Sequence, residues 1–159
     1  MSGLHIGESN VTIENKVFSG SNYANEIMED GTKRGTFRSY SVLVDGNNVS
    51  FRNCLFENTA GKGKDVGQAI ALYIDGDGIT LENCKILGHQ DTLFIAPLPD
   101  KEIIPGGFVG PKQFTERKRR TVYFKNCIIE GGVDFIFGGA TAYFENCEFV
   151  SVEEGYVFA

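Results

Sequence analysis

The sequence has few of the residues that build metal centres. Its only histidines are His5 and His89, and its four cysteines occur singly rather than in a C-x-x-C pair. Because protein zinc sites need Cys and His ligands at close, regular spacings, we expect no metal site in this chain.

Long apolar runs are absent as well. No apolar stretch approaches the roughly 18 residues of a transmembrane helix, so we expect no membrane-spanning segment. The opening residues MSGLHIGESN lack a charged start followed by an apolar core, so we do not expect them to act as a signal peptide. A G-x-S-x-G motif is missing too, which disfavours an ordinary serine esterase.

The composition favours a single all-β domain. A chain of 159 residues can bury a sizeable core, and a hydrophobic content of 42% argues against disorder. Twenty glycines, thirteen phenylalanines and few helix-forming runs are typical of a β protein rich in turns. The net charge of −6 argues against a general nucleic-acid-binding protein.

A short pattern recurs along the chain. Apolar and polar residues alternate up to an Asn-Cys pair, which indicates a half-buried strand ending in a sharp bend, since Asn tolerates left-handed backbone. The copies are VSFRNCLF (49–56), ITLENCKI (79–86), VYFKNCII (122–129) and AYFENCEF (142–149), with VTIENKVF (11–18) as a weaker copy. In that weaker copy Lys16 replaces Cys, so it is either out of register or at an exposed end.

The repeat predicts a parallel β-helix, a single-chain solenoid. Successive asparagines are 38, 30, 43 and 20 residues apart, and coils of short strands without helices fit such spacings better than a β-sandwich with coincidental turns. We expect the asparagine side chains to form a hydrogen-bonded ladder. The cysteines should be buried free thiols, although two disulfides are the alternative.

Two stretches interrupt the repeat. Residues 19–48 are mostly polar until a strand at Ser41–Val44, and residues 96–121 hold all four prolines. The second stretch predicts a long loop that forms the wall of a cleft. Its basic run, residues 117–120, could attract an acidic polymer, but a solvated loop end is the favoured interpretation.

Two aspartates carry the functional prediction. Asp91 in GHQDTLF and Asp134 in GGVDFIF each stand seven residues after a repeat cysteine, so we expect them at one position on consecutive coils. Neighbouring strands lie about 4.8 Å apart, and two carboxylates that close raise the pKa of one of them. Such a pair suits acid-base chemistry.

Two glutamines complete the predicted site. Gln68 in GQAIALYI precedes an apolar run as the aspartates do, so we expect it in the same row, and Gln90 is adjacent to Asp91. One Asp could attack an ester carbonyl, the other could protonate the leaving alcohol, and the amides could donate to the oxyanion. His89 is interpreted as a surface or packing residue.

Three further residues have two interpretations each. Phe94 and Phe137 could stack on sugars or belong to the core. Thr36, in GTFRSY, could donate a hydrogen bond in the cleft or hold a turn.

Three ordered motifs carry a family resemblance. GQAIAL (67–72), GHQDTLF (88–94) and GGVDFIFGGATAYFENC (131–147) resemble core motifs of pectin methylesterases (pectinesterases), carbohydrate esterases built on a right-handed parallel β-helix. GTFRSY (35–40) and NTAGKG (58–63) are also similar to family segments. Bacterial members carry long loops in the region that matches 96–121, so the resemblance favours a bacterial type.

The resemblance implies a set of roles. Asp134 matches the nucleophile, Asp91 the general acid that then acts as base, and Gln68 and Gln90 the oxyanion-stabilising amides. The substrate-binding positions are Thr36, Gln68, Phe94 and Phe137. The substrate would be pectin, or a methylated oligogalacturonide, demethylated at C6 with release of methanol. The resemblance implies no cofactor, no nucleic-acid or membrane partner, a monomer, and a family that is often secreted or associated with the cell wall.

One departure from the family stands out. Family members continue to an L-G-R-P-W motif whose Arg orients the nucleophile, and this motif is absent here. The resemblance therefore implies that residues 1–159 are a single, incomplete and truncated β-helix domain with weak or no activity. Two alternatives stay open: another pectin-degrading β-helix enzyme, such as a lyase or glycosidase, and a non-catalytic β-helix that binds carbohydrate.

Overall fold

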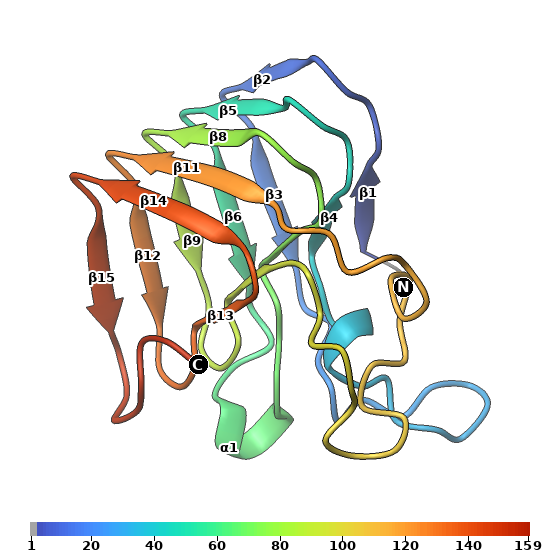
Figure 1. Ribbon diagram of the computed structural model, residues 1–159. Helices are drawn as coiled ribbons and strands as arrows, with labels where there is room; N and C mark the ends of the chain where they lie inside the picture. The colour runs from blue at the N-terminus through green and yellow to red at the C-terminus, as the bar shows by residue number, and fades with distance from the viewer. Residues whose placement is uncertain (1–2) are drawn as a thin grey trace.

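The structure, a computed structural model that describes residues 3–159, is a parallel β-helix (Figure 1). Successive coils add one strand to each of three parallel five-stranded sheets. The first sheet contains β1 (Leu4–Ile6), β4 (Val42–Val44), β7 (Leu72–Ile74), β10 (Leu93–Ile95) and β13 (Ile136–Gly138). The second contains β2 (Thr12–Glu14), β5 (Ser50–Arg52), β8 (Ile79–Glu82), β11 (Thr121–Lys125) and β14 (Thr141–Glu145). The third contains β3 (Val17–Gly20), β6 (Leu55–Asn58), β9 (Lys85–Leu87), β12 (Ile128–Gly131) and β15 (Glu148–Ser151).

The predicted β-helix is thus confirmed, and helical structure is minor. It consists of the single-turn helix α1 (Gly63–Val66) and a 3₁₀ turn, η1 (Thr36–Arg38). Within residues 3–159, no helix has the length and apolar character needed to cross a membrane.

The repeat asparagines make the bend between the second and third sheets. Their φ angles lie between 50° and 55°, in the left-handed region, at Asn15, Asn53, Asn83, Asn126 and Asn146. The predicted ladder of asparagine side chains is wrong. These side chains are exposed, and no side-chain hydrogen bond joins these five asparagines. Backbone groups bond adjacent coils instead, as where the Asn53 N–H donates to the Glu82 carbonyl at 3.0 Å.

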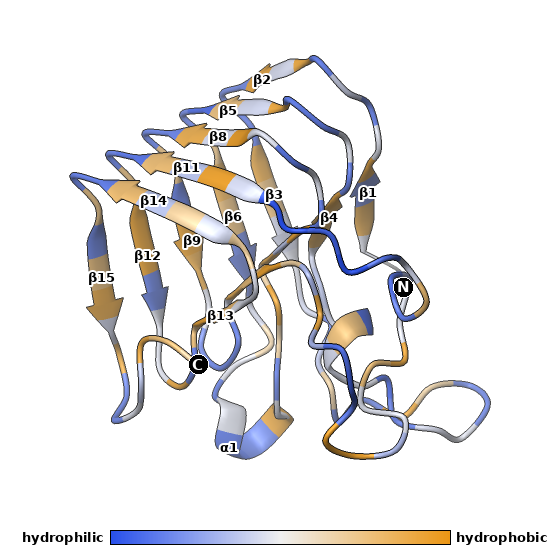
Figure 2. Ribbon diagram, viewed as in Figure 1, coloured by the Kyte–Doolittle hydropathy of each residue, from blue (hydrophilic) through white to orange (hydrophobic). Residues whose placement is uncertain are grey.

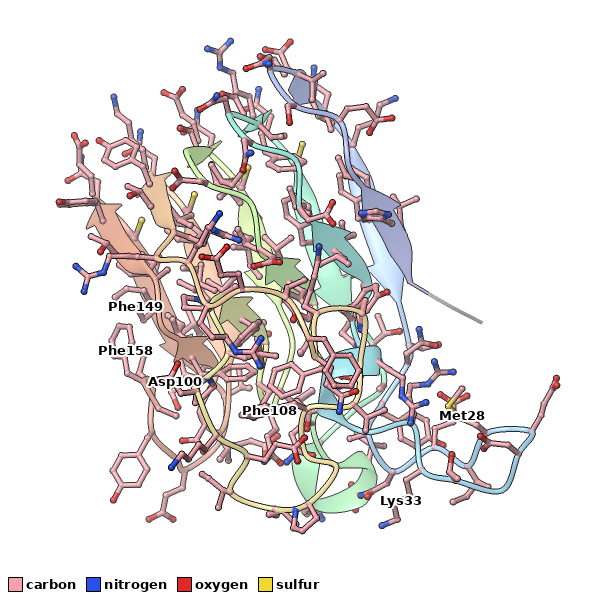
Figure 3. The ribbon with its side chains drawn as sticks, turned by 45° about the vertical axis from the view of Figure 1, so that its right-hand side comes forward. Met28, Lys33, Asp100, Phe108, Phe149 and Phe158 are labelled. Atoms are coloured by element: carbon pink, nitrogen blue, oxygen red, sulfur yellow. The ribbon has the colours of Figure 1, made fainter. Side chains whose placement is uncertain are left out.

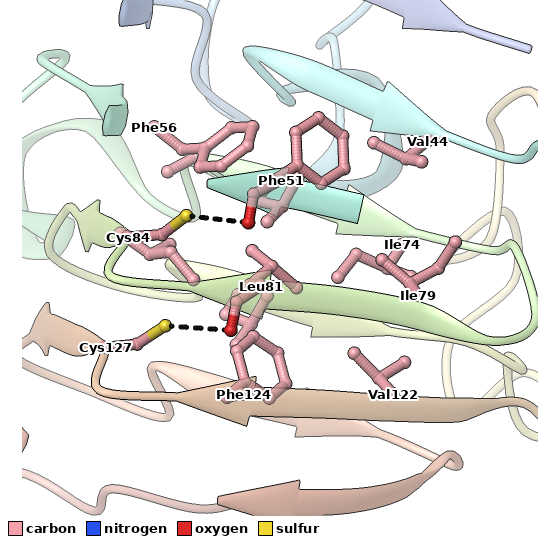
Figure 4. Close-up of a cluster of buried hydrophobic side chains, with 14 of the residues drawn as sticks. Val44, Phe51, Phe56, Ile74, Ile79, Leu81, Cys84, Val122, Phe124 and Cys127 are labelled. Atoms are coloured by element: carbon pink, nitrogen blue, oxygen red, sulfur yellow. Dashed lines mark hydrogen bonds between the residues drawn. The ribbon is translucent and has the colours of Figure 1, made fainter. Parts of the chain in front are cut away.

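The repeat cysteines point into the solenoid, as predicted. All four are free thiols; Cys147 is half-buried, and the other three are buried. The Cys84 thiol donates to the Phe51 carbonyl at 3.6 Å, and the Cys127 thiol donates to the Leu81 carbonyl at 3.4 Å (Figure 4). The weaker copy is in register, because Val17 pairs with Leu55, and Lys16 is exposed, so its coil is at an exposed end.

The interior is a continuous apolar core. Side chains alternate along each strand, so that every second one points into the solenoid. Figure 2 shows the hydrophobic residues concentrated on the strands. Phe51, Phe56, Leu81 and Phe124 are fully buried in this cluster (Figure 4). Burying each such side chain contributes roughly 1.5–3 kcal/mol, so stacking of coils supplies most of the stability.

Three long excursions surround the outer face of the first sheet. Residues 21–41 and 59–71 connect the third sheet to the first, and residues 96–120 connect the first sheet to the second. The predicted insertion at 96–121 is therefore confirmed, with Thr121 already inside β11. The outer side chains of the first sheet form a second apolar cluster, centred on Tyr73 and Phe94, beneath these excursions.

Candidate active site

Asp91 and Asp134 occupy the same corner of consecutive coils. Asp91 lies between β9 and β10, and Asp134 lies between β12 and β13. Because Leu93 pairs with Ile136, the two aspartates are level with each other, and the Asp91 N–H donates to the Val133 carbonyl at 3.0 Å. The predicted pairing of the two acids is confirmed.

Both aspartates have unusual backbone conformations. Their φ angles are 62° at Asp91 and 46° at Asp134, in the left-handed region. Asp tolerates this region better than most residues, yet the conformation still costs on the order of 1 kcal/mol, and such strain concentrates at functional sites. The surrounding coils hold both residues in this turn.

The two acids have different surroundings. Asp91 is 9% exposed, whereas Asp134 is half-buried. Burial, together with the smaller effect of the negative charge of Asp134, raises the pKa of Asp91 to about 8. The predicted rise of one pKa is confirmed, but burial rather than the neighbouring acid is the larger cause. Asp91 is therefore mostly protonated at neutral pH.

Gln68 lies one residue out of the predicted row of the aspartates. Leu72 pairs with Leu93, but the register shifts by one residue just before this pair, because the N–H groups of Ala71 and Leu72 both donate to the Thr92 carbonyl. The Ala69 N–H donates to the Gln90 carbonyl at 3.1 Å, and this places Gln68 beside Gln90.

The two glutamines therefore share the corner that holds Asp91. Both are half-buried. The Gln90 side chain lies against Gly63 in α1, where a Cβ atom would overlap its amide. The absence of a side chain at Gly63 leaves the room that this amide occupies.

The aromatic residues form a cluster beside the acids. The ring centroids of Phe94 and Phe137 are 4.8 Å apart, and Phe37 from η1 lies 5.1 Å from Phe94. Phe94 is only 1% exposed and so belongs to the outer core, while Phe137 is half-buried. Thr36 is half-buried next to Phe37, and its carbonyl accepts a 2.6 Å hydrogen bond from Ser39 Oγ, which holds the turn.

A cleft of about 610 Å³ lies over this cluster, between the first sheet and the loop 96–120. Phe37, Phe94 and Phe137 line it from the sheet side. The loop contributes Pro97, Leu98, Pro99, Asp100, Ile103, Phe108, Arg117 and Arg119; Figure 3 shows Asp100 and Phe108 on this loop. The loop is therefore a cleft wall, as predicted.

The acids lie beside this cleft rather than in its lining. Asp91 precedes Phe94 by three residues and Asp134 precedes Phe137 by three, so the acids lie in the corners just before β10 and β13. The sequence placed Phe108 and Arg119 in the loop expected to form the cleft wall, and Arg119 in its basic run, without marking either as a lining residue. Phe37 carried no such signal, because chain folding alone brings 21–41 over the same sheet as 96–120.

The basic run at the end of the loop is not simply solvated. Arg117 donates to the backbone carbonyls of Pro99, Lys112, Gln113 and Thr115, and thus holds the loop in shape. Arg120 Nε donates to the Asp75 carbonyl at 2.7 Å. The prediction of a solvated loop end is wrong for these two arginines; it fits Arg119, which is exposed, and Lys118, which pairs with exposed Glu116.

A charged cluster fastens the loop to the solenoid. Lys112 Nζ contacts Asp45 Oδ2 at 2.5 Å and Asp75 Oδ2 at 3.5 Å. Asp75 also contacts Arg120, and His5 contacts Asp45. The wall of the cleft is therefore anchored to the ends of β4 and β7.

His89 has a local partner. Its Nδ1 lies 2.6 Å from Glu153 Oε1, and both side chains are largely covered. This contact agrees with its interpretation as a packing residue. Across residues 3–159, no three His, Cys, Asp or Glu side chains are grouped to hold a metal ion.

The fold and the site together define a class: a parallel β-helix with paired, unequal carboxylates beside an aromatic cleft on one sheet. The family model described as Pectinesterase matches residues 9–98. This chain belongs to the pectinesterase family.

Known relatives agree with this assignment. Pectinesterase 31 from Arabidopsis thaliana is 33% identical over 153 residues, covering 94% of this chain and 41% of its own length. The pectin methylesterase structure from Yersinia enterocolitica has a TM-score of 0.76 at 25% identity, covering 99% of this chain and 51% of that one. The structure of a pectin methylesterase in complex with a hexasaccharide has a TM-score of 0.70 at 25% identity. The match covers 94% of this chain and 43% of that one. The chain thus spans about half, or less, of the length of these relatives.

Proposed function

We propose that this site hydrolyses the C6 methyl esters of galacturonate units in pectin. The observation that carries the proposal is the pair formed by Asp91 and Asp134, level on adjacent coils, of which Asp91 is protonated at neutral pH. A reaction that needs one carboxylate as nucleophile and one carboxylic acid as proton donor requires such an unequal pair. Membership of the pectinesterase family and the hexasaccharide bound by a structural relative support the substrate class.

The first half of the reaction forms an acyl-enzyme. The Asp134 carboxylate attacks the ester carbonyl carbon, and the amide groups of Gln68 and Gln90 donate to the oxyanion. Asp91 gives its proton to the methoxy oxygen as the C–O bond breaks, and methanol leaves. Asp91 is now a carboxylate, and the galacturonate is held as a mixed anhydride on Asp134.

The second half restores both acids. The Asp91 carboxylate takes a proton from water as the water oxygen attacks the anhydride carbonyl. The bond to Asp134 breaks, Asp134 leaves as a carboxylate, and the pectin unit is released as the free acid. Phe137 and Thr36 are proposed to contact the sugar, with Phe94 supporting Phe137 from beneath.

The 159 residues by themselves are proposed to turn over slowly. Among residues 3–159, neither Lys nor Arg forms an ion pair with Asp134, so the nucleophile lacks a cationic partner to orient it. Monomeric behaviour is likewise proposed rather than established.

Methanol release from methylated oligogalacturonide at high protein concentration tests the proposal. Asp134→Asn and Asp91→Asn should each abolish release, whereas Asp65→Asn, at an exposed site in α1, should leave the rate unchanged. New reducing ends or unsaturated products without methanol would instead indicate a glycosidase or a lyase. Binding of the oligosaccharide with no product of any kind would indicate a non-catalytic β-helix.

A further inference from the structure

The contact between His89 and Glu153 joins two distant parts of the chain beside the corners that hold Asp91 and Asp134. His89 Nδ1 lies 2.6 Å from Glu153 Oε1, although the two residues are 64 positions apart in the sequence. Their side chains are only 29% and 19% exposed. A contact covered in this way is screened less than one on an open surface, so it can hold two segments together.

His89 is part of both acid corners. It lies in the turn that leads to Asp91, and its carbonyl accepts a hydrogen bond from Thr92 Oγ1 at 3.3 Å, which closes that turn. The same carbonyl accepts a hydrogen bond from the Gly132 N–H, on the coil of Asp134, at 2.8 Å. A shift of His89 would therefore move the turn of one acid and the residues just before the other.

Glu153 comes from the next corner of the solenoid. It follows β15, as Gly132 follows β12 and His89 follows β9, and from there the chain turns back beside β13 (Figure 1). A Cβ atom on Gly132 would lie only 2.8 Å from Glu153 Cβ, so the missing side chain leaves the path that Glu153 takes to His89. A Cβ atom on Gly155 would lie 2.5 Å from the Gly132 carbonyl oxygen, so this segment packs directly on the turn before Asp134.

The spacing of the two acids makes such a link important. In the proposed reaction the Asp134 carboxylate reaches the ester carbonyl while Asp91 reaches the methoxy oxygen, and a small misplacement of either group lowers the rate steeply. The main-chain bond from Asp91 to Val133 is one connection between the two corners. The side chains of His89 and Glu153 add a second connection, which spans three coils.

We propose that His89 and Glu153 are positioning residues, which clamp three consecutive corners of the solenoid and so fix the separation of Asp91 and Asp134. This inference rests on the proposed esterase and goes beyond it, because neither residue takes part in a step of the reaction. The pair acts through the backbone of Gly132 and the turns beside it. Its loss should therefore slow the chemical step and leave substrate binding nearly intact.

Steady-state kinetics of methanol release test the role in the reaction. His89→Leu and Glu153→Leu should each lower kcat about tenfold and change KM less than twofold, since displaced reacting groups cost rate rather than affinity. The double variant should be no slower than either single variant, because the two side chains act as one unit. Glu153→Gln should recover most of the rate, because its amide oxygen still accepts a hydrogen bond from His89 Nδ1.

Amide hydrogen exchange, followed residue by residue by NMR, tests the clamp without turnover. The N–H groups of Asp91 and Gly132 bond across the two corners, so both should exchange about tenfold faster in Glu153→Leu. The Asn53 N–H, which joins two earlier coils, should exchange at the wild-type rate. A loss of global stability alone would instead speed exchange at all three amides.

Glu14→Leu is the matched control. Glu14 Oε1 lies 3.2 Å from Arg52 Nη1, so this pair also joins adjacent coils, but in the second sheet and at the other end of the solenoid from the acids. The variant should leave kcat, KM and hydrogen exchange at Asp91 unchanged. If Glu153→Leu does not fold, Glu153→Ala removes the same carboxylate without adding a bulky apolar side chain and takes its place.

Three results would overturn the inference. These are an unchanged exchange rate at Asp91 in Glu153→Leu, equal acceleration at Asn53, and losses in kcat that add when His89→Leu and Glu153→Leu are combined. Failure of the proposed esterase gives a different outcome. If wild type releases no methanol but Glu153→Leu loosens only the acid corners, the esterase proposal fails and the clamp stands.

Discussion

The Asp91 backbone N–H donates to the carbonyl of Val133, the residue before Asp134, at 3.0 Å. This bond ties together two corners that both have left-handed backbone, so the acids are held as neighbours by main-chain contacts. Their difference comes from burial: Asp91 is covered and protonated, whereas Asp134 reaches the surface.

The first prediction is a fall in esterase rate on the alkaline side. Asp91 must be protonated to donate to the leaving methoxy group, and its pKa is about 8. The methanol-release rate at saturating substrate should therefore decline above about pH 8, tenfold per pH unit once the acid is ionised. A rate that keeps rising to pH 10 would show that Asp91 is not the proton donor.

Stability should also depend on Asp91. Its pKa is about 8 in the folded chain and has an ordinary value of 3.8, so from about pH 4 to pH 8 only the folded form holds this proton. The free energy of unfolding should fall as pH rises through that window. Asp91→Asn should flatten this fall in the free energy of unfolding and, at pH 8, stabilise the fold by on the order of 5 kcal/mol.

Urea unfolding at several pH values measures this effect. Asp65→Asn, at an exposed carboxylate, should keep the pH slope of wild type. An Asp91→Asn variant whose slope also equals that of wild type would contradict the raised pKa.

Lys112 should be required to hold the loop 96–120 against the solenoid. Its ammonium contacts both Asp45 and Asp75, and all three side chains are largely covered. Lys112→Met leaves two part-buried carboxylates with one partner each. We therefore expect the free energy of unfolding to fall by about 1–2 kcal/mol. Limited proteolysis with identification of the cut sites should show faster cleavage within 96–120.

The matched control for this prediction is Lys118→Met. Its exposed pair with Glu116 should contribute less than about 0.5 kcal/mol. Equal proteolysis of the two variants would show that the charged cluster does not anchor the loop.

The left-handed bends should favour Asn or Gly. Asn83 has a φ of 53° and an exposed side chain, so its conformation rather than its contacts selects the residue. Asn83→Ala should destabilise the fold by about 1 kcal/mol, whereas Asn83→Gly should be nearly neutral. Thermal unfolding of both variants measures the difference, and equal losses would point to a side-chain role.

The thiols should react in two groups. Cys147 is half-buried, while Cys54, Cys84 and Cys127 are buried. A thiol reagent with mass-spectrometric readout should label Cys147 first and the other three only on unfolding. Cys147→Ala should remove the fast phase; rapid labelling of Cys84 in the native state would contradict the packing.

The site could be predicted from the sequence only in part. Asp91 and Asp134 were found because both follow a cysteine at the same distance, and the coil repeats that distance. Gln68 was misplaced because the difference in residue number between hydrogen-bonded partners on adjacent coils changes between Ala69 and Leu72. Counting residues back from the strand therefore does not locate Gln68. The asparagine ladder failed for a different reason, since a left-handed bend turns its side chain to solvent.

The sequence by itself determined the coil, through alternating apolar residues, an Asn that accepts a left-handed bend, and an inward thiol. These features recur at a constant distance from each Asp, which sets the register of the two acids. The tertiary structure alone decided three features: which loops meet over the first sheet, which arginines form hydrogen bonds that hold the loop, and that Asp91 is the buried acid. These features depend on contacts between residues far apart in the chain, and no local pattern of residue types encodes where a long excursion comes to rest.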